Sequence, residues 1–216
     1  MALASTTTTA MESASSKTDV IFKALKWLDE KLKLSVLVDL PGIFQEIVEK
    51  LLQYPIVSAA IITWLKCDIS IFQRNLNAAG RVPIHFILLE EIALVQPMQQ
   101  AMVFSFLQEI YEYSSGDVAV LVSIQFKKIC IDRFIFLIRC GFVGPVIDYF
   151  CLKKNSMDES LLVYFLNELH EIIDADADAN NFNYNIISPQ LTQLISNLSE
   201  TSQSKLSIVL NLKKKE

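Results

Sequence analysis

One histidine and two glutamates lie close together in the segment VPIHFILLEEIALVQP (residues 82–97), and these residue types can bind a metal ion or transfer a proton. His85 precedes Glu90 by five positions and Glu91 by six, whereas side chains that meet on one helix are three or four positions apart. A helix turns by about 100° per residue, so His85 falls in the middle of the apolar face and both glutamates turn roughly 120–140° away. The zinc-protease pattern His-Glu-x-x-His is absent from the segment. We therefore predict that His85 is a buried structural residue rather than a ligand or a base.

The acidic stretch DADADANN (residues 174–181) is a second candidate, because carboxylates of this spacing occur in calcium-binding loops. An EF-hand loop that began at Asp174 would need glycine at its sixth position and glutamate at its twelfth. Those positions hold Ala179 and Asn185. We expect a solvated acidic loop, not a calcium site. The second histidine, His170, lies among acidic residues in NELHEII and is expected on a helix surface.

Motifs of catalysis and cofactor binding are missing from the chain. There is no Gly-x-Ser-x-Gly, no phosphate-binding loop and no Gly-x-Gly-x-x-Gly, and the sequence has only two histidines. The sequence therefore predicts a protein that is not an enzyme and has no metal site, cofactor or catalytic residue. The four cysteines form no Cys-x-x-Cys pair, and we expect them in apolar surroundings as free thiols of a protein in a reducing compartment.

The composition predicts helices that are covered on several sides. The 216 residues are 52% hydrophobic and 20% charged, with only five glycines, which is too apolar for disorder and too poor in glycine for a turn-rich β-protein. No apolar run without a charged residue reaches the roughly 20 residues that span a bilayer. The best candidate, residues 55–65, ends at Lys66, so we expect no membrane contact. Unusually apolar helices are typical of stacked repeats, whose inner helices touch several neighbours.

Charge and composition divide the chain into segments. Residues 17–154 hold 15 Lys and Arg against 14 Asp and Glu, whereas residues 155–204 hold eight acidic residues and no Lys or Arg. Such blocks indicate an acidic end face and do not suggest a large basic surface for duplex DNA. We predict a disordered Ser/Thr-rich tail at 1–17, an α-helical repeat domain at 18–200 and a C-terminal helix with a basic tail at 201–216.

Proline spacing indicates a repeat. Pro41 and Pro83 are 42 residues apart, and so are Pro55 and Pro97. Proline is tolerated in the first turn of a helix, and two helices in about 40–47 residues is the period of HEAT-type repeats. We therefore predict an all-α fold, a HEAT-like solenoid of stacked antiparallel helix pairs. The helices are expected at 18–34, 42–53, 55–67, 83–95, 97–113, 117–140, 143–154, 158–174, 188–199 and 204–212.

Three local signals mark helix ends. The segment SMDE predicts a capping box in which Ser156 and Glu159 bond to each other's backbone amides. Ser188 before Pro189 predicts an N-cap followed by a proline in the first helical position. Gly141, after Arg139 and Cys140, predicts a helix that ends on glycine.

Two cations stand out in the apolar stretch 117–150. On a helical projection, one narrow strip of mixed charge carries the polar residues Gln125, Lys128, Asp132 and Arg139. Lys127 and Arg133 fall outside this strip. Either their side chains extend past apolar neighbours to reach water, or they pair with another chain or with a phosphate.

The sequence also resembles a known family. The segments YPIVSAAIITWLKCDIS, VPIHFILLEEI, KKICIDRFIFLIRCGFVGPVIDY and LLVYFLNELHEII are similar, in order and spacing, to the C-terminal region of the negative elongation factor C/D family. The similarity covers roughly residues 50–175. The most specific positions are Tyr54–Pro55, Trp64, Pro83–His85, Leu88–Leu89, Glu91–Ile92, Lys127–Lys128, Asp132–Arg133, Arg139, Gly141 and Pro145. Members of that family are much longer at the N-terminus, where this chain has a Ser/Thr-rich tail.

The resemblance implies a non-catalytic HEAT-like scaffold in a nuclear complex that holds RNA polymerase II in promoter-proximal pausing. It implies the other negative elongation factor subunits and the RNA polymerase II complex as partners, and it allows single-stranded RNA as a ligand. Together with the charge pattern it makes Lys127, Lys128, Arg133 and Arg139 candidate contacts to another subunit or to RNA. A helical-repeat interaction scaffold of an unrelated pathway is the alternative.

Overall fold

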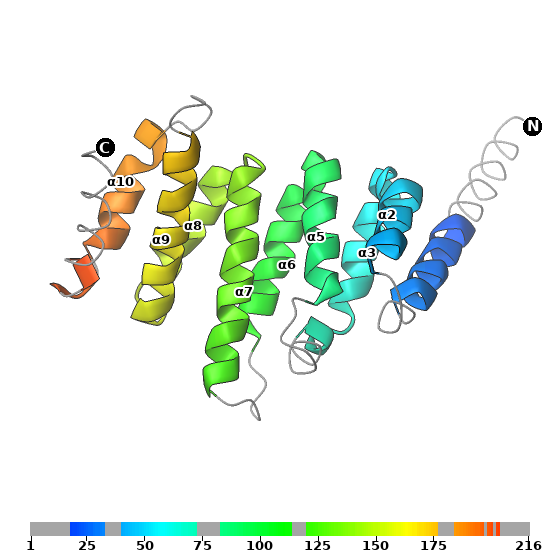
Figure 1. Ribbon diagram of the computed structural model, residues 1–216, viewed down its shortest axis with the longest axis horizontal. Helices are drawn as coiled ribbons and strands as arrows, with labels where there is room; N and C mark the ends of the chain where they lie inside the picture. Colours follow the sequence, from blue (N-terminus) through cyan, green and yellow to red (C-terminus); the bar gives the residue numbers. More distant parts are fainter. Residues whose placement is uncertain are drawn as a thin grey trace, which may run out of the picture. The chain divides into compact units, whose positions relative to one another are not determined.

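The computed structural model describes residues 18–32, 40–72, 83–113, 120–176, 184–196, 198–200 and 202–203. The described residues are helical, with turns between helices and no strand, so the predicted all-α class is confirmed (Figure 1). The chain divides into two compact units, residues 1–106 and 107–216. No helix within the described ranges is long and apolar enough to cross a membrane.

The first unit contains a helix at residues 18–32 and a series of further helical segments. These are α2 (Leu40–Ile47), the π-helix η1 (Val48–Leu52), α3 (Pro55–Lys66), α5 (Ile84–Val95), the 3-10 helix η2 (Pro97–Gln99) and the first half of α6 (Gln100–Glu112). The second unit contains the rest of α6, then α7 (Val120–Arg139), α8 (Val143–Lys153), α9 (Glu159–Asp176) and α10 (Tyr184–Ile195). Most boundaries lie within three residues of the predicted ones.

Aromatic packing organises the core of the first unit. The ring of Phe72 lies 4.9 Å from that of Phe86 in α5 and 5.5 Å from that of Phe106 in α6, both edge to face. Two glutamine side chains add hydrogen bonds between consecutive helix pairs. Gln96 donates to the carbonyl oxygen of Leu52 at 2.9 Å, and Gln99 donates to that of Pro55 at 3.4 Å. The junction between α5 and α6 is thereby held against the start of α3.

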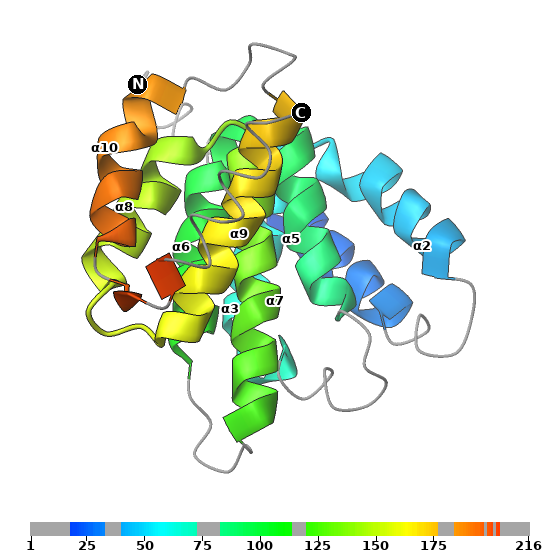
Figure 2. The same ribbon diagram turned by 60° about the vertical axis from the view of Figure 1, so that its left-hand side comes forward.

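In the second unit α7 contacts both α8 and α9, and α10 lies against α8 (Figure 2). Phe134 of α7 is fully buried, and its ring lies 5.5 Å from Tyr149 and 5.7 Å from Phe150 of α8. Phe150 in turn stacks on Phe165 of α9, with ring centroids 3.6 Å apart and nearly parallel planes. These ring contacts join α7, α8 and α9 in one aromatic core. Each such pair stabilises the fold by about 0.5–1.5 kcal/mol in addition to the hydrophobic effect of burying its surface.

Gly141 ends α7 as predicted. Its φ of +92° is the left-handed conformation that side chains disfavour. The amide of Gly141 donates to the carbonyl of Ile138 and the amide of Phe142 to that of Leu137, both at 2.9 Å. These two bonds form a Schellman motif, which satisfies the last carbonyls of the helix.

The predicted capping box at SMDE is wrong. The cap of α9 is Asp158, whose carboxylate accepts hydrogen bonds from the amide and the hydroxyl of Ser160. Ser156 instead donates to the carbonyl of Lys153, in the turn that ends α8. Glu159 accepts two hydrogen bonds from Ser199, 40 residues away, so a distant partner replaces the local one.

The predicted start of a helix at Pro189 is also wrong. Helix α10 begins at Tyr184, and Pro189 lies inside it. An internal proline removes one backbone hydrogen bond. The apolar spacing of four and three residues across Ile187, Leu191 and Leu194 continues through the proline, which favours one continuous helix over two shorter ones. The predicted tail at 1–17 and helix at 204–212 lie outside the described residues.

The cap at Gly141 gives a stability prediction with a built-in control. Gly141→Ala should destabilise the protein by roughly 1–2 kcal/mol, because alanine resists the left-handed conformation although no atom lies within 4 Å of its new methyl group. Gly42→Ala, at an exposed position within α2, should be neutral or stabilising by up to about 1 kcal/mol, because alanine favours the helical conformation. Urea unfolding of both variants measures the difference; equal effects would show that the conformation of Gly141 costs alanine nothing.

Candidate interaction site

The predicted cations Lys127 and Lys128 are neighbours on α7, and each lies over a tyrosine ring of a different helix. The ammonium of Lys127 is 5.4 Å from the ring centroid of Tyr111 in α6, and that of Lys128 is 4.9 Å from that of Tyr164 in α9. Both lysines are half-buried. A cation over an aromatic face gains about 0.5–1 kcal/mol at an exposed site. The aliphatic stems therefore pack within the unit while the charges stay near the surface.

Tyr164 joins the second of these contacts to a carboxylate. Its hydroxyl donates to Asp132 Oδ1 at 2.7 Å, so Lys128, Tyr164 and Asp132 connect α7 to α9. Burial raises the pKa of Tyr164, and the hydrogen bond to Asp132 raises it further. Tyr164 is thus a neutral donor at physiological pH, and Asp132 lies close to the cationic pair.

Lys127 also lies near the first turn of α9. The pKa of Asp158 is below its usual value, mainly because Ser160 donates two hydrogen bonds to the carboxylate and in smaller part because of the Lys127 charge. The negative charge of Asp158 partly neutralises the positive charge of Lys127. A ligand of Lys127 therefore has to compete with Asp158 for its charge.

The other two predicted contacts differ in exposure. Arg133 is half-buried, and its Nε and Nη1 atoms are buried. Arg139, the last residue of α7, is exposed. We expected the residues of the mixed-charge strip to be more exposed than the cations outside it. This difference is only partly present, because Lys128, within the strip, is half-buried like Lys127, outside it. The role of all four residues as partner contacts stays a prediction.

A second polar group of this unit was not foreseen from the sequence. Glu112, at the end of α6, pairs with Lys153 of α8 at 2.8 Å and accepts a hydrogen bond from the Tyr149 hydroxyl at 3.2 Å. The hydrogen bond from Lys153 is the main reason that the pKa of Glu112 is lowered. These residues are about 40 positions apart in the sequence, so no local pattern could reveal them.

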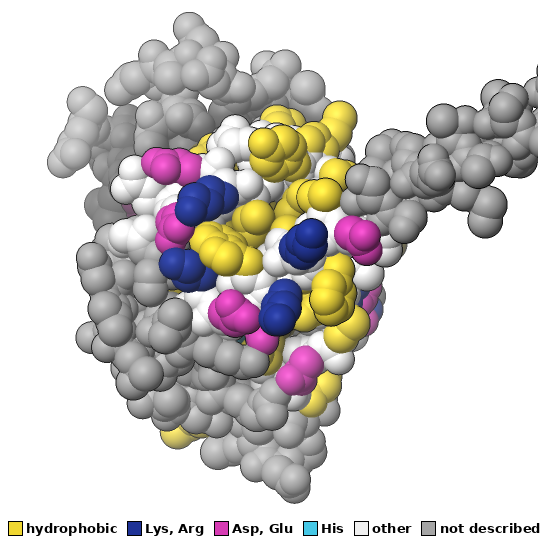
Figure 3. Space-filling model, turned by 90° about the vertical axis from the view of Figure 1, so that its right-hand side faces the viewer, with side chains coloured by type: hydrophobic (Ala, Val, Ile, Leu, Met, Phe, Trp, Pro, Cys, Tyr) yellow, Lys and Arg dark blue, Asp and Glu magenta, His cyan; other side chains and the backbone are white. Residues whose placement is uncertain are grey.

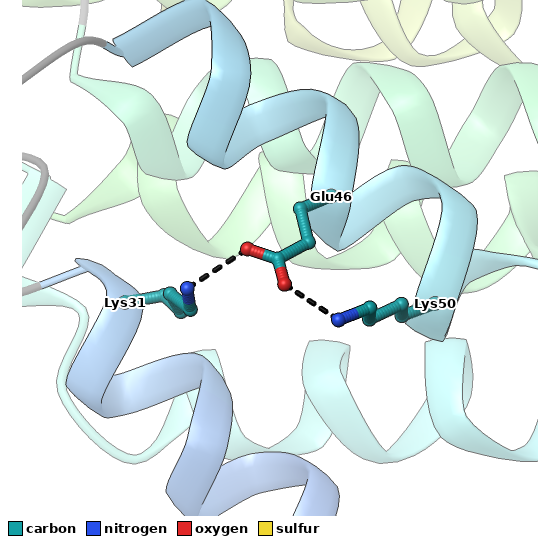
Figure 4. Close-up of polar contacts among 3 residues, drawn as sticks. All are labelled: Lys31, Glu46 and Lys50. Carbon is teal, nitrogen blue, oxygen red and sulfur yellow. Dashed lines mark hydrogen bonds and ion pairs between the residues drawn. The ribbon is translucent and has the colours of Figure 1, made fainter.

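The first unit has a similar group at its surface. Glu46 of α2 binds Lys31 at 2.8 Å through one carboxylate oxygen and Lys50 at 2.6 Å through the other (Figure 4). Both ammonium groups also lie over the Trp27 ring, at 5.2 and 5.6 Å from its centroid. The spacing of Glu46 and Lys50 predicts such a pair, whereas Lys31 comes from another helix. Figure 3 shows the face on the side of helix 18–32 and α2, where cationic, acidic and apolar side chains alternate.

His85 is buried, as predicted, with 5% of its surface exposed. Its ring lies 5.6 Å from that of Phe72, edge to face. Burial lowers its pKa to about 4, against a smaller opposing effect of the Asp68 charge. The imidazole is therefore neutral at pH 7. Glu90 and Glu91 are half-buried on the same helix.

The other two candidate sites differ from expectation in detail. His170 is half-buried and its Nε2 atom is buried, so it is not the simple surface residue that was predicted. Helix α9 runs to Asp176, so the predicted acidic loop does not begin at Asp174; alanine between the acids favours helix there. Residues 177–181 of that stretch lie outside the described residues. Within the described ranges, no three His, Cys, Asp or Glu side chains form a group that could hold a metal.

All four cysteines are free thiols. Cys130 is buried, Cys140 and Cys151 are half-buried, and Cys67 is exposed. The expectation of apolar surroundings therefore fails for Cys67, which follows the last residue of α3 at the helix surface.

Replacement of His85 should change how stability depends on pH. In the wild type the unfolded histidine takes up a proton near its ordinary pKa of 6.5, whereas the folded one does so only near 4. The stabilisation that comes from keeping His85 neutral is therefore fully present above pH 6.5. It is lost as the pH falls from 6.5 to 4, which lowers the free energy of unfolding by about 3 kcal/mol in total. His85→Leu should remove this part of the acid destabilisation, and should alter stability at pH 7 by no more than about 1–3 kcal/mol.

The measurement is the free energy of unfolding in urea at several pH values, for wild type and variant. Four carboxylates with lowered pKa also lose stabilisation in acid, namely Glu46, Glu112, Asp158 and Glu159. They are present in both proteins, so their effect cancels in the difference. Parallel curves for the two proteins would contradict a neutral, buried His85.

Comparison with known proteins identifies relatives of the chain. The family model described as "TH1 protein" matches residues 6–182. Negative elongation factor D of Mus musculus is 27% identical over 124 residues, which is 56% of this chain and 21% of that protein. Negative elongation factor D of Sus scrofa gives the same identity and the same coverage. The matched region thus spans about a fifth of the length of these curated relatives.

The match to the family extends over both compact units and includes α3, α5 and α7, where the segments that resemble the family lie. It covers well over half of the chain. This chain therefore belongs to the TH1 protein family and is homologous to negative elongation factor D.

Proposed function

We propose that this protein is a non-catalytic scaffold subunit of a negative transcription elongation factor complex, and that it promotes promoter-proximal pausing of RNA polymerase II in the nucleus. The observation that carries this proposal is the family match over residues 6–182, together with the similarity to negative elongation factor D. The partners would be the other subunits of the complex and the RNA polymerase II complex.

The proposed scaffold is a HEAT-like solenoid. Two observations support this arrangement in the first unit: α3 begins at Pro55, and η2, which leads into α6, begins at Pro97, 42 residues later. The two glutamine hydrogen bonds described above lie at this same junction. We propose the domain limits 1–17, 18–200 and 201–216 from the composition and charge along the sequence.

A non-catalytic role agrees with the state of the polar residues. His85 is buried and neutral at pH 7, and His170 has a buried Nε2. Lys127 and Lys128 of the second unit each lie over a tyrosine ring of another helix. A general base has to reach its substrate, whereas the ring of His85 is buried and so is the Nε2 atom of His170.

Contacts to partners are proposed at Lys127, Lys128, Arg133 and Arg139 along α7. The two lysines are fixed by tyrosine rings yet only half-buried, so an incoming acidic group meets positioned charges rather than mobile side chains. The segment 155–204, with eight acidic residues and no Lys or Arg, opposes strong binding of RNA by this chain alone. An acidic surface on another subunit of the complex is therefore favoured over single-stranded RNA.

The proposal is tested by co-purification. We expect the tagged chain, expressed in cells of its own source, to bring down other negative elongation factor subunits and RNA polymerase II from nuclear extract. A tagged His85→Leu variant, which keeps the surface unchanged, should do the same. If neither is recovered while the folded chain captures other proteins reproducibly, the chain is a helical interaction scaffold of an unrelated pathway.

A double variant tests the α7 surface. Lys127→Ala with Arg133→Ala should weaken binding to another subunit or to single-stranded RNA and make binding less sensitive to salt. For RNA, each lost phosphate contact should reduce the slope of log affinity against log salt by about 0.7. Fluorescence anisotropy at several salt concentrations gives both quantities.

The matched control is Lys23→Ala with Lys26→Ala, which removes two exposed cations from the first unit. It should leave affinity and slope unchanged. Thermal melting establishes that both double variants are folded. If the α7 variant binds both ligands with the affinity and slope of the wild type, its cations only pack against apolar neighbours.

A further inference from the structure

Asp132 is placed on α7 where it could neutralise Lys128. The two residues are four positions apart on one helix, a spacing at which an acid and a base commonly pair. Both belong to the part of the chain that the structure describes, and no ion pair joins them there. The ammonium of Lys128 lies instead over the ring of Tyr164 in α9, 4.9 Å from its centroid.

The hydroxyl of Tyr164 accounts for this arrangement. It donates to Asp132 Oδ1 at 2.7 Å and so reaches across from α9 to α7. A hydrogen bond to an ionised acceptor is stronger than one between neutral groups. Burial and then the bond to Asp132 raise the pKa of Tyr164, so the hydroxyl keeps its proton. The carboxylate therefore has a neutral donor, and Lys128 is not paired with the acid on its own helix.

An acid near Lys127 is engaged in the same manner. The carboxylate of Asp158 accepts hydrogen bonds from the amide of Ser160 at 2.8 Å and from its hydroxyl at 2.5 Å. The Lys127 charge makes only a minor contribution to the lowered pKa of Asp158, and these two described residues form no ion pair. Neutral donors of α9 thus hold both acids, while both lysines lie over tyrosine rings.

The order of the residues makes a single hydrogen bond sufficient. Lys128 precedes Asp132, and a base four positions before an acid is the weaker of the two orders on a helix. One charge-assisted hydrogen bond from Tyr164 can therefore decide which partner the carboxylate takes. A ring face supplies no full negative charge that a ligand would have to displace. An acid from another chain can then approach Lys128 without breaking an ion pair.

We infer that Tyr164 is a positioning residue of the α7 surface: its hydroxyl keeps Asp132 from pairing with Lys128, and its ring holds the ammonium where a carboxylate of the partner can bind it. The inference rests on the proposed contact between α7 and an acidic surface of another subunit. It adds a residue outside α7 that determines the affinity of this contact. Without the hydroxyl, Asp132 would pair with Lys128 and compete with the ligand.

The probe for the test is a fluorescein-labelled peptide of alternating Glu and Gly, and its binding to the full chain is followed by anisotropy. The affinity should fall with rising salt, because exposed charges are screened. Tyr164→Phe keeps the ring but loses the hydroxyl, and it should weaken binding by about two- to fivefold. When Asp132→Asn is already present, Tyr164→Phe should have no effect, since no carboxylate remains to compete. A purely structural role of Tyr164 would weaken binding in both backgrounds.

The matched control is Tyr149→Phe. The Tyr149 hydroxyl also donates to a carboxylate of the same unit, that of Glu112, at 3.2 Å. This variant should bind the probe as the wild type does. Thermal melting establishes that each variant is folded. A peptide with Gln in place of Glu should not bind, because it carries no charge for the lysines.

The outcomes separate this inference from the contact on which it rests. If the wild type does not bind the probe, or if Lys128→Ala binds it equally well, the contact at Lys128 fails and the inference fails with it. If Lys128→Ala weakens binding but Tyr164→Phe does not, or if Tyr164→Phe acts equally with and without Asp132→Asn, the inference alone is overturned. Tighter binding of single-stranded oligouridylate than of the peptide at the same salt would overturn the assignment to carboxylates. The proposed function is judged separately, by the recovery of the complex subunits with the wild-type chain.

Discussion

Phe134 is the side chain through which most of the second unit is connected. Its buried ring contacts Tyr149 and Phe150 of α8 and lies 6.1 Å from Tyr111 of α6, while Phe150 stacks on Phe165 of α9. A helix with rings against it from two sides cannot keep a single apolar stripe, so α7 is apolar around most of its circumference. Few positions on α7 are then left for polar residues, and these residues interact with neighbouring helices. The ammonium groups of Lys127 and Lys128 lie over the rings of Tyr111 and Tyr164.

The parts of the fold that local chemistry determines could be predicted from the sequence. Proline in the first turn locates the start of α3, and the glycine after α7 has the left-handed conformation that only glycine adopts easily. Residues that depend on distant partners could not be predicted. Glu159 binds Ser199 instead of completing a capping box, and Pro189 lies within a helix whose apolar spacing outweighs one lost hydrogen bond. The π-helix η1, which directly continues α2, has no signal in composition or periodicity.

The candidate sites show the same division. Helical periodicity is sufficient to place His85 in the core, because its neighbours at helical spacing are apolar. Periodicity places Lys128 within the polar strip of α7 and Lys127 outside it, whereas both are half-buried in the structure, and periodicity cannot show that each lies over a tyrosine of another helix. The exposure of Ile56 and Met98 could not be predicted, because in so apolar a sequence both have the character of core residues, and only the structure reveals that they are exposed. In a chain so rich in apolar residues, the informative observation is which of them remain outside.

The burial of Cys130 allows thiol labelling to detect local opening of the second unit. The thiol of Cys130 in α7 is fully buried, and burial raises its pKa, so alkylating reagents do not reach it and the reactive thiolate is disfavoured while the unit is closed. Cys67, on the first unit, is exposed and sets the rate of an accessible thiol in the same molecule. When labelling is resolved for each cysteine, so that the half-buried Cys140 and Cys151 are counted separately, the rate at Cys130 relative to Cys67 measures how often the helices around Phe134 separate, without unfolding the protein by denaturant.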